Sequence, residues 1–397
     1  MVTTTDTYTS SRHRTTPGEG YDGVVRISYN ALYGSGVLLY DGRAILTAAH
    51  LLNTASANQV SIRMETTAGV ASLNASAITL HPQYDAANAN HDLAIIWLSS
   101  AAPVAANRYT LYREEDEIGR TFVMAGYGKQ GSGATGTADA GDALLRLKTE
   151  NQFDADAAAL KSFQGSAMSW TPLTGTLLVA DFDDGSASHD ALGALMNLSG
   201  TGLGEGEGLI APGDSGGPAF ISGKLAGIAG YTAALGYGDT QPDIDSLSNS
   251  SFGEVGFWHR ISAHQQWIDQ SLRAAYPNTP TSAATVEKTI TEPNSGASLV
   301  YFLLEFTGTR ANPDAWISVD YATRDGTALA GSDYLAASGT LILYPDETRA
   351  VIPVEVMGDN LAESSEVFYL DVFNPVGGSF GEGVLQLTAM RTILDTD

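Results

Sequence analysis

Three polar residues have the types that nucleophilic catalysis needs. Ser215 lies in the glycine-rich run Gly213–Pro218 (GDSGGP), His50 ends the segment Leu46–His50 (LTAAH), and Asp92 stands just before an apolar run. A serine hydroxyl is a weak nucleophile at its ordinary pKa, and it needs a histidine base that a carboxylate holds in the right tautomer. The three segments therefore predict acyl transfer with Ser215 as nucleophile, His50 as base and Asp92 as the residue that orients His50.

Acyl transfer also needs two N–H donors where negative charge develops on the tetrahedral intermediate. The backbone N–H groups of Gly213 and Ser215 are placed to supply them. A glycine at position 213 lets the turn approach a substrate without a Cβ in the way.

Short apolar segments must position these residues. Val37–Tyr40, Ala44–Thr47 and Leu93–Leu98 alternate with Gly, Asn and Asp turns, which is the pattern of buried strands. The stretch Ser262–Ala275 has apolar residues on one helical face and predicts a helix. The first 20 residues are rich in Thr, Ser and Arg, and they predict a flexible tail.

A composition change divides the chain. Residues 276–283 (YPNTPTSA) contain two prolines among small polar residues and predict a linker. After them, alternating strands and Asn-Pro or Asp-Gly turns predict a β-sandwich. We expect a tail at 1–20, a catalytic domain at 21–275, the linker at 276–283 and a second domain at 284–397.

Composition narrows the function classes. The chain has 397 residues, no Cys, 20 Lys+Arg and 45 Asp+Glu, which gives a net charge of −25. A strong polyanion is repelled by nucleic acid and by anionic membranes, so we expect no nucleic-acid partner. The lack of Cys excludes a disulfide scaffold, a Cys-zinc site and a Cys nucleophile. No apolar run is long enough to span a membrane, so we expect no membrane insertion.

The motifs resemble those of the trypsin/chymotrypsin family of serine proteases. Thr47–His50 matches the TAAH histidine motif of that family, Asp92–Ala94 its aspartate motif, and Gly213–Pro218 its GDSGGP serine motif. The resemblance covers roughly residues 15–275. It implies an all-β fold, a chymotrypsin-like double β-barrel with a C-terminal helix, with two six-stranded barrels and the triad between them. It implies chemistry that needs no cofactor.

Two acidic stretches depart from compact members of that family, Asp181–Gly185 (DFDDG) and Gly202–Gly208 (GLGEGEG). The first resembles half of a calcium loop. The EF-hand pattern fails because it needs a Glu where this chain has Leu192. A calcium site and a solvated acidic turn are both open, and we favour the turn.

Activation in the resembled family often frees an N-terminus that pairs with the carboxylate beside the nucleophile, which here is Asp214. Arg12 and Arg14 offer basic cleavage points ahead of the expected fold. We therefore hypothesise that a cut after Arg14 or Arg12 matures the enzyme. An ordinary disordered tail is the alternative.

The position six residues before Ser215 forms the base of the primary pocket in the resembled family, and here it is Leu209. Gly230 and Gly256 stand at the expected pocket walls. These residues predict an open apolar pocket and cleavage after apolar or aromatic residues. If the alignment slips in this glycine-rich stretch, Glu205 or Glu207 would occupy the base and favour basic residues.

The second domain resembles a Calx-beta domain along nearly its whole length. The motifs are Asp325–Ala328 (DGTA), Gly331–Tyr334 (GSDY), Ser338–Leu341 (SGTL) and Glu363–Phe368 (ESSEVF). The resemblance implies an immunoglobulin-like Greek-key β-sandwich.

Some Calx-beta members bind Ca²⁺, which needs several oxygens converging at about 2.3–2.6 Å. The acidic residues at matching positions here are Glu292, Asp333, Asp359 and Asp395. Ser338 and Asn360 stand where stronger binders have further acids. Calcium binding in this domain and a purely structural spacer are both open.

These patterns favour a secreted or cell-surface serine endopeptidase that acts on protein or peptide substrates. We expect a monomer. Residues 1–6 lack the basic start and apolar stretch of a signal peptide. A catalytically silent adhesion or binding protein on the same fold is the main alternative, since fold does not determine function. An esterase using the same triad is a third.

Overall fold

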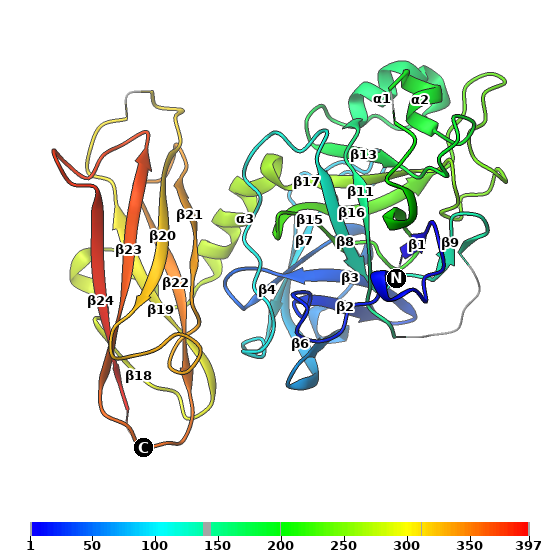
Figure 1. The fold of residues 1–397 in the computed structure, drawn as a ribbon. Coiled ribbons are helices and arrows are strands. Elements are labelled where there is room, and N and C mark those ends of the chain that lie inside the picture. The colour runs from blue at the N-terminus through cyan, green and yellow to red at the C-terminus, as the bar shows by residue number, and fades with distance from the viewer. Residues whose placement is uncertain (1, 138–143, 199, 311, 396–397) are drawn as a thin grey trace. The chain divides into compact units, whose positions relative to one another are not determined.

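A computed structural model describes residues 2–137, 144–198, 200–310 and 312–395 (Figure 1). The chain divides into two compact units, one formed by residues 1–39 and 43–265 and the other by 40–42 and 266–397. The division falls inside the helix Ile261–Ala275, ten residues before the predicted domain boundary.

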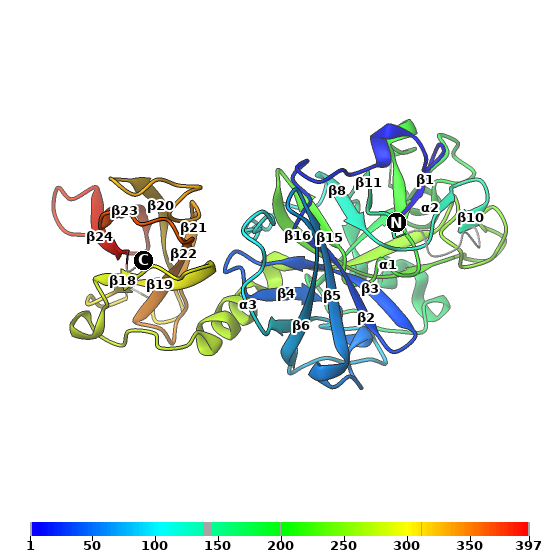
Figure 2. The same cartoon turned by 90° about the horizontal axis from the view of Figure 1, so that it is seen from below.

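Six strands in the first half of the larger unit close into a barrel in the order β2-β3-β4-β7-β6-β5 (Figure 2). Their inward residues, among them Val25, Leu38 and Ile45, are fully buried and form one apolar core. The β-branched and aliphatic alternation that predicted strands here is therefore the inner face of the barrel. The strands are β2 (Val24–Tyr29), β3 (Leu32–Leu38), β4 (Ala44–Thr47), β5 (Val60–Thr66), β6 (Gly69–Leu80) and β7 (Ala94–Leu98).

The second half of this unit is built on a seven-stranded sheet in the order β11-β8-β15-β16-β17-β13-β12. The family resemblance implied six strands here, and the sheet has one more than that because it includes the short edge strand β12. In its core the rings of Phe122 and Phe153 stack with their centroids 3.9 Å apart, and Trp258 packs edge-on against both. The strands are β8 (Thr121–Gly126), β11 (Leu147–Gln152), β12 (Ala155–Asp156), β13 (Leu177–Asp181), β15 (Pro218–Ile221), β16 (Lys224–Ala233) and β17 (Val255–Arg260).

The N-terminal segment is folded, so the prediction of a flexible tail over residues 1–20 is wrong. β1 (Val2–Thr4) is buried and pairs with β14 (Gly208–Ile210) on one side and β9 (Gly131–Ser132) on the other, and β10 (Gly136–Thr137) completes this sheet. The side chain of His13 is also buried, with Nε2 2.6 Å from Asp6 Oδ1. The polar Thr residues suggested a tail. In the structure, their backbone groups form strand hydrogen bonds with residues of β14, which are more than 200 positions away in the sequence.

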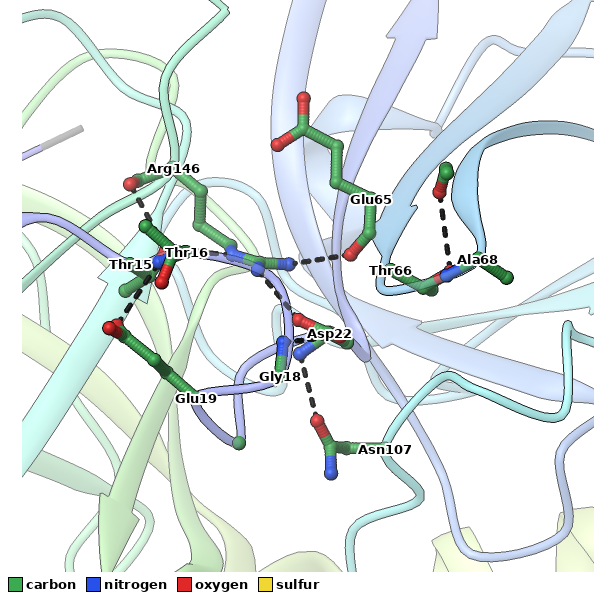
Figure 3. A network of polar contacts seen from close by, with 12 residues as sticks. Thr15, Thr16, Gly18, Glu19, Asp22, Glu65, Thr66, Ala68, Asn107 and Arg146 are labelled. Carbon is green, nitrogen blue, oxygen red and sulfur yellow. Dashed lines mark hydrogen bonds and ion pairs between the residues drawn. The ribbon is translucent and has the colours of Figure 1, made fainter.

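A buried ion pair ties the residues that follow this segment to the domain (Figure 3). Arg146 donates through NH2 to Asp22 Oδ1 at 2.9 Å, through Nε to Thr15 Oγ1 at 2.8 Å and through NH1 to the Glu65 carbonyl at 3.2 Å. Both charged groups are almost completely buried. Removing one partner would leave the other as a buried, uncompensated charge. The pair therefore holds in place the segment around Asp22 that leads into the first barrel.

The second unit contains a β-sandwich, as the sequence predicted. One sheet has the order β18-β24-β23-β20-β21, and the other pairs β19 with β22. Phe302, Val354 and Phe368 belong to the core between them. The strands are β18 (Thr289–Thr291), β19 (Gly296–Glu305), β20 (Ile317–Asp325), β21 (Ser338–Leu343), β22 (Arg349–Gly358), β23 (Glu366–Val376) and β24 (Gln386–Leu394).

Helices are few. α1 (Ala157–Gln164) and α2 (Ala191–Met196) begin at Asp156 and Asp190, whose side chains accept hydrogen bonds from backbone N–H groups of the first turn. α3 (Ile261–Ala275) corresponds to the predicted helix. None of the helices among the described residues has both the length and the apolar character needed to cross a membrane.

Candidate active site

His50 and Asp92 come together at one end of the first barrel. His50 lies in a short 3₁₀ turn, Ala49–Leu51, directly after β4, and Asp92 lies just before β7, the strand paired with β4. Asp92 accepts two hydrogen bonds from His50, one from the backbone N–H to Oδ1 at 2.7 Å and one from Nδ1 to Oδ2 at 2.6 Å. The second bond leaves Nε2 of the neutral imidazole as the basic nitrogen.

Asp92 is buried, yet it favours the ionised form. Burial acts to raise the pKa of Asp92, but the hydrogen bonds that it accepts from His50 act against burial, and the pKa stays below its ordinary value. A second histidine, His259, lies behind the carboxylate with Nε2 4.0 Å from Asp92 Oδ2. Burial lowers the pKa of His259 to about 3, so this ring is neutral. Among the described residues, neither of its ring nitrogens has a hydrogen-bond partner.

The segment that carries Asp92 is supported by stacked histidines. His91 has a left-handed backbone (φ 51°), its ring stacks on His81 at 4.6 Å, and its Nδ1 is 3.0 Å from Nε2 of His264. Burial lowers the pKa of His81 to about 3 and that of His264 to about 4. Sequence reasoning treated these residues as structural and did not predict their proximity.

Ser215 lies in the turn between β14 and β15. Gly213 there has φ +97°, and a Cβ at this position would collide with the Tyr33 ring, so only glycine fits. Among the described residues, no hydrogen bond uses the N–H of Gly213 or of Ser215. Both donors that the sequence predicted for an oxyanion are therefore available.

Ser35, which sequence reasoning missed, holds this turn from the first barrel. It lies in β3, its hydroxyl donates to the Gly213 carbonyl at 3.0 Å, and its backbone N–H donates to the Ser215 carbonyl at 2.9 Å. Thr47 Oγ1 donates to the Ser35 carbonyl at 2.8 Å. Ser35 belongs to no motif, so the sequence offered only one signal for this contact, which is Thr47 in the LTAAH segment.

Ser215 and His50 line one pocket of about 410 Å³, but they do not hydrogen-bond to each other here. The Ser215 hydroxyl points to the Gly230 carbonyl at 3.4 Å, a long contact. Hydrogen bonds between a catalytic serine and its base are often loose until substrate binds.

The structure does not bring the three predicted substrate-pocket residues together in one pocket. Gly230 lines the pocket together with Ile210, Ala211 and Thr232. Leu209 is fully buried in the core, and the Leu209 and Trp258 side chains fill the space in front of Gly256, where a Cβ would lie 2.8 and 2.6 Å from them. Leu209 and Gly256 are therefore packed behind the pocket and do not form an open one.

The alternative pocket acids lie elsewhere. Glu205 is exposed and pairs with Arg12 at 2.7 Å, whereas Glu207 is buried and its Oε1 accepts from the Asp183 N–H at 3.0 Å. Neither lines the pocket. The structure thus gives no acidic pocket base.

Asp214, beside the nucleophile, is buried and accepts from the N–H groups of Gly128 (2.8 Å) and Ala211 (3.0 Å). Burial raises the pKa of Asp214 to about 6. Arg14 is exposed and its backbone bridges to Leu147. Because the residues before Arg14 are part of the folded unit, the cleavage hypothesis finds no support in this arrangement.

The acidic stretch near residue 181 differs from the favoured prediction. Asp181, Asp183 and Asp190 are buried, and only Asp184 is exposed in the manner of a solvated turn. Oxygen atoms of the three buried residues lie within 4.8 Å of one another.

In the sandwich, the acidic residues gather at one end but in a different combination from the one predicted. Asp333 forms a close group with Glu363 and Glu366. Glu292 accepts from the Asp359 N–H at 3.1 Å, and Asp395 accepts from the Glu363 N–H. Burial and the neighbouring carboxylates raise the pKa of Glu366 to about 7. The E-x-x-E spacing of Glu363 and Glu366 was the available signal for the two residues that sequence reasoning left out.

Comparison with known proteins supports two domains. The family model described as Trypsin matches residues 11–151, which include His50 and Asp92, and the model described as Calx-beta domain matches residues 304–397. Sodium/calcium exchanger 2 from Homo sapiens is 32% identical over 142 residues, covering 29% of this chain and 15% of the exchanger. The Drosophila melanogaster sodium/calcium exchanger Calx is 36% identical over 91 residues, covering 22% and 9%.

This chain therefore spans less than a sixth of the length of those curated relatives, which match its Calx-beta region. Among solved structures, mouse neuropsin, described as a serine protease expressed in the limbic system, has a TM-score of 0.47 and 17% identity, covering 66% of this chain and 98% of neuropsin. The chain contains a trypsin-like serine protease domain followed by a Calx-beta domain.

Proposed function

We propose that this protein is a serine endopeptidase that hydrolyses peptide bonds through an acyl-enzyme. The observation that carries the proposal is one pocket in which Ser215 and the His50–Asp92 pair lie beside two N–H groups that no acceptor among the described residues uses. That combination is what acyl transfer by serine requires.

In the proposed reaction Ser215 Oγ attacks the scissile carbonyl carbon while His50 Nε2 takes its proton. The oxyanion that forms accepts hydrogen bonds from the N–H groups of Gly213 and Ser215. His50 then protonates the leaving amine, the C–N bond breaks, and an ester to Ser215 remains. Water, deprotonated by His50, hydrolyses that ester and restores the serine.

The cleft favours extended peptides with a small apolar residue before the scissile bond, a narrower preference than the apolar or aromatic one predicted from sequence. Leu209 and Trp258 fill the depth in which a large side chain would sit. A neighbouring cavity of about 610 Å³ shares Tyr231 and Thr232 with the catalytic pocket and is lined further by Trp170 and Leu235. Room for several substrate residues supports an endopeptidase over an esterase for small esters.

The test is labelling of the full chain with a fluorophosphonate probe, read by intact mass, with Ser215→Ala as control. We expect one adduct on the wild-type protein and none on the variant. Labelling without turnover of any peptide in a library would favour the esterase. No labelling of folded protein would favour the catalytically silent binding protein.

Substrate preference is tested by Leu209→Ala. Removing this side chain opens space in front of Gly256, so kcat/KM for substrates with Phe before the scissile bond should rise about 10- to 100-fold relative to Ala substrates. The lost burial costs about 2–5 kcal/mol of stability, so the comparison is made well below the midpoint of thermal unfolding. If the ratio of kcat/KM for Phe substrates to kcat/KM for Ala substrates does not change, the inference that Leu209 fills the pocket is wrong.

We further propose that the protein works outside the cell and that the Calx-beta domain binds Ca²⁺ through Asp333, Glu363 and Glu366. The support is the convergence of these carboxylates, which suits a hard cation. Calcium titration of wild type against Asp333→Asn tests this binding, and equal calcium binding by both proteins would leave the domain a spacer.

A further inference from the structure

A group of buried carboxylates lies near the end of β13 in the protease-like unit. These residues take no part in the triad. Asp181 ends β13, Asp183 follows in the next loop, Asp190 caps α2, and Glu207 precedes β14. All four are at least nine-tenths buried. Within the described part of the chain, no salt bridge involves any of them.

Several of their oxygens already accept backbone hydrogen bonds. Asp181 Oδ2 accepts from the Leu192 N–H at 2.5 Å, Asp190 Oδ1 from the Gly193 N–H at 2.5 Å, and Glu207 Oε1 from the Asp183 N–H at 3.0 Å. These bonds orient the carboxylates but supply no positive charge. A buried carboxylate without a counter-charge is costly, so each of these groups must either hold a proton or gain a cation.

Asp183 shows where the compensation is missing. Its side chain is 4% exposed, and its Oδ1 has no hydrogen-bond partner within the part of the chain that the structure describes. Oxygens of Asp181, Asp183 and Asp190 lie within 4.8 Å of one another. Oxygens this close together can all reach one ion, since a Ca–O distance is about 2.3–2.6 Å.

We propose that Asp181, Asp183 and Asp190, with Glu207 beside them, form a binding site for one calcium ion. The oxygen-only ligand set and the burial suit a hard divalent cation, which offsets two of the three charges of the aspartates. Mg²⁺ suits the site less well, since it demands near-ideal octahedral geometry and usually keeps several of its waters.

The proposed ion would join segments that support the catalytic pocket. The Asp183 N–H bonds to Glu207, and the residues directly after Glu207 form β14, whose Ile210 lines the pocket. Asn151 bridges the same region by donating to the carbonyls of Asp181 and Gly208 at 2.7 and 3.0 Å. We therefore expect calcium to raise the stability of this unit, whether or not the protein is a protease.

The experiment is thermal unfolding of the full chain in EDTA and after addition of 1 mM Ca²⁺ or Mg²⁺. For wild type we expect Ca²⁺ to raise the Tm of the protease-like unit by at least about 5 °C, with a smaller shift for Mg²⁺. Asp183→Asn should lose this shift. Asp184→Asn, the exposed neighbour, should keep it, and Asp333→Asn should keep it because its carboxylate lies in the other unit.

Bound calcium per chain, measured by equilibrium dialysis, gives the second readout: one ion fewer in Asp183→Asn than in Asp184→Asn. If Asp183→Asn does not fold, Glu207→Gln replaces it, with a weakened calcium affinity expected. The proposal is overturned if wild type and Asp183→Asn respond equally to Ca²⁺, including no response in either, or if Mg²⁺ matches Ca²⁺.

Discussion

The protein buries carboxylates in two contrasting ways. Asp92 is held below its ordinary pKa because His50 bonds both of its oxygens, whereas Asp183 has its pKa raised because burial and other acids surround it. The two side chains are almost equally buried, at 3% and 4% exposure. The difference teaches that burial alone does not decide the charge of a carboxylate, and that its contact partner does.

The largest test of this comparison is Asp92→Asn. Removing the charge lets His50 adopt the wrong tautomer, so kcat for a peptide substrate should fall about 10⁴-fold while the fold is retained. Steady-state kinetics and a circular dichroism spectrum check both parts. A fall of less than tenfold would contradict the assigned role of Asp92.

The acid cluster predicts a pH dependence of opposite sign to that of an ion-paired acid. Burial raises the pKa of Glu207 to about 7, so the native state keeps a proton that the unfolded state loses above about pH 4.3. In EDTA the free energy of unfolding should therefore fall as pH rises towards 7, by about 1.4 kcal/mol per unit for each such proton, or by about 2.5 kcal/mol between pH 5 and 8 for Glu207, which loses its proton near pH 7.

The measurement is urea unfolding at several pH values with and without Ca²⁺. Calcium should flatten the fall, because it stabilises the ionised carboxylates. Asp183→Asn should flatten it in EDTA, since one titrating group is gone. A rise of stability with pH in EDTA would contradict the unpaired state of the cluster.

A smaller effect is expected at His259, the second ring near Asp92. His50 bonds Asp92 at 2.6 Å, whereas His259 lies 4.0 Å away and is neutral. His259→Leu should change kcat/KM by less than about tenfold and leave stability nearly unchanged, because it removes two unpaired buried nitrogens. A loss comparable to that of Asp92→Asn would show that His259 positions the carboxylate.

The smallest effect is expected at the Calx-beta acids, which are less buried. Glu366→Gln should change Tm by less than about 2 °C in EDTA, since solvent screens exposed charges. Differential scanning calorimetry measures this change. If Glu366→Gln changes Tm as much as Asp183→Asn does, then the burial of a carboxylate has less effect on stability than we infer.

The sequence predicted those parts of the site that sit in short contiguous motifs. His50, Asp92, Gly213 and Ser215 each belong to such a segment, and their order along the chain indicated the two-part domain. The spacing from Ser215 also located Leu209, but it could not give the direction of its side chain. Leu209 pairs with Thr3 in the β1–β14 ladder and faces the core, a register that depends on residues 206 positions away.

Long-range pairing explains the other errors. The Thr-rich start was predicted to be a tail because nothing local reveals a strand partner near residue 209. The acids at 181–190 and Glu207 were considered separately because the sequence does not show that β13 and β14 bring them together. Local patterns report propensity and periodicity, whereas burial of a charged group depends on the completed fold.

The hydrogen bonds from Ser35 have a consequence for how activity appears during synthesis. Ser35 and Gly213 are separated by 178 residues, so the turn that carries the nucleophile acquires its support only when both halves of the unit have been made. At about 5–20 residues per second, roughly 9–36 s separate the two segments on the ribosome. A chain that is still being synthesised therefore has no supported Gly213–Ser215 turn, and the proposed peptidase activity can begin only after the late strands pack on the early ones.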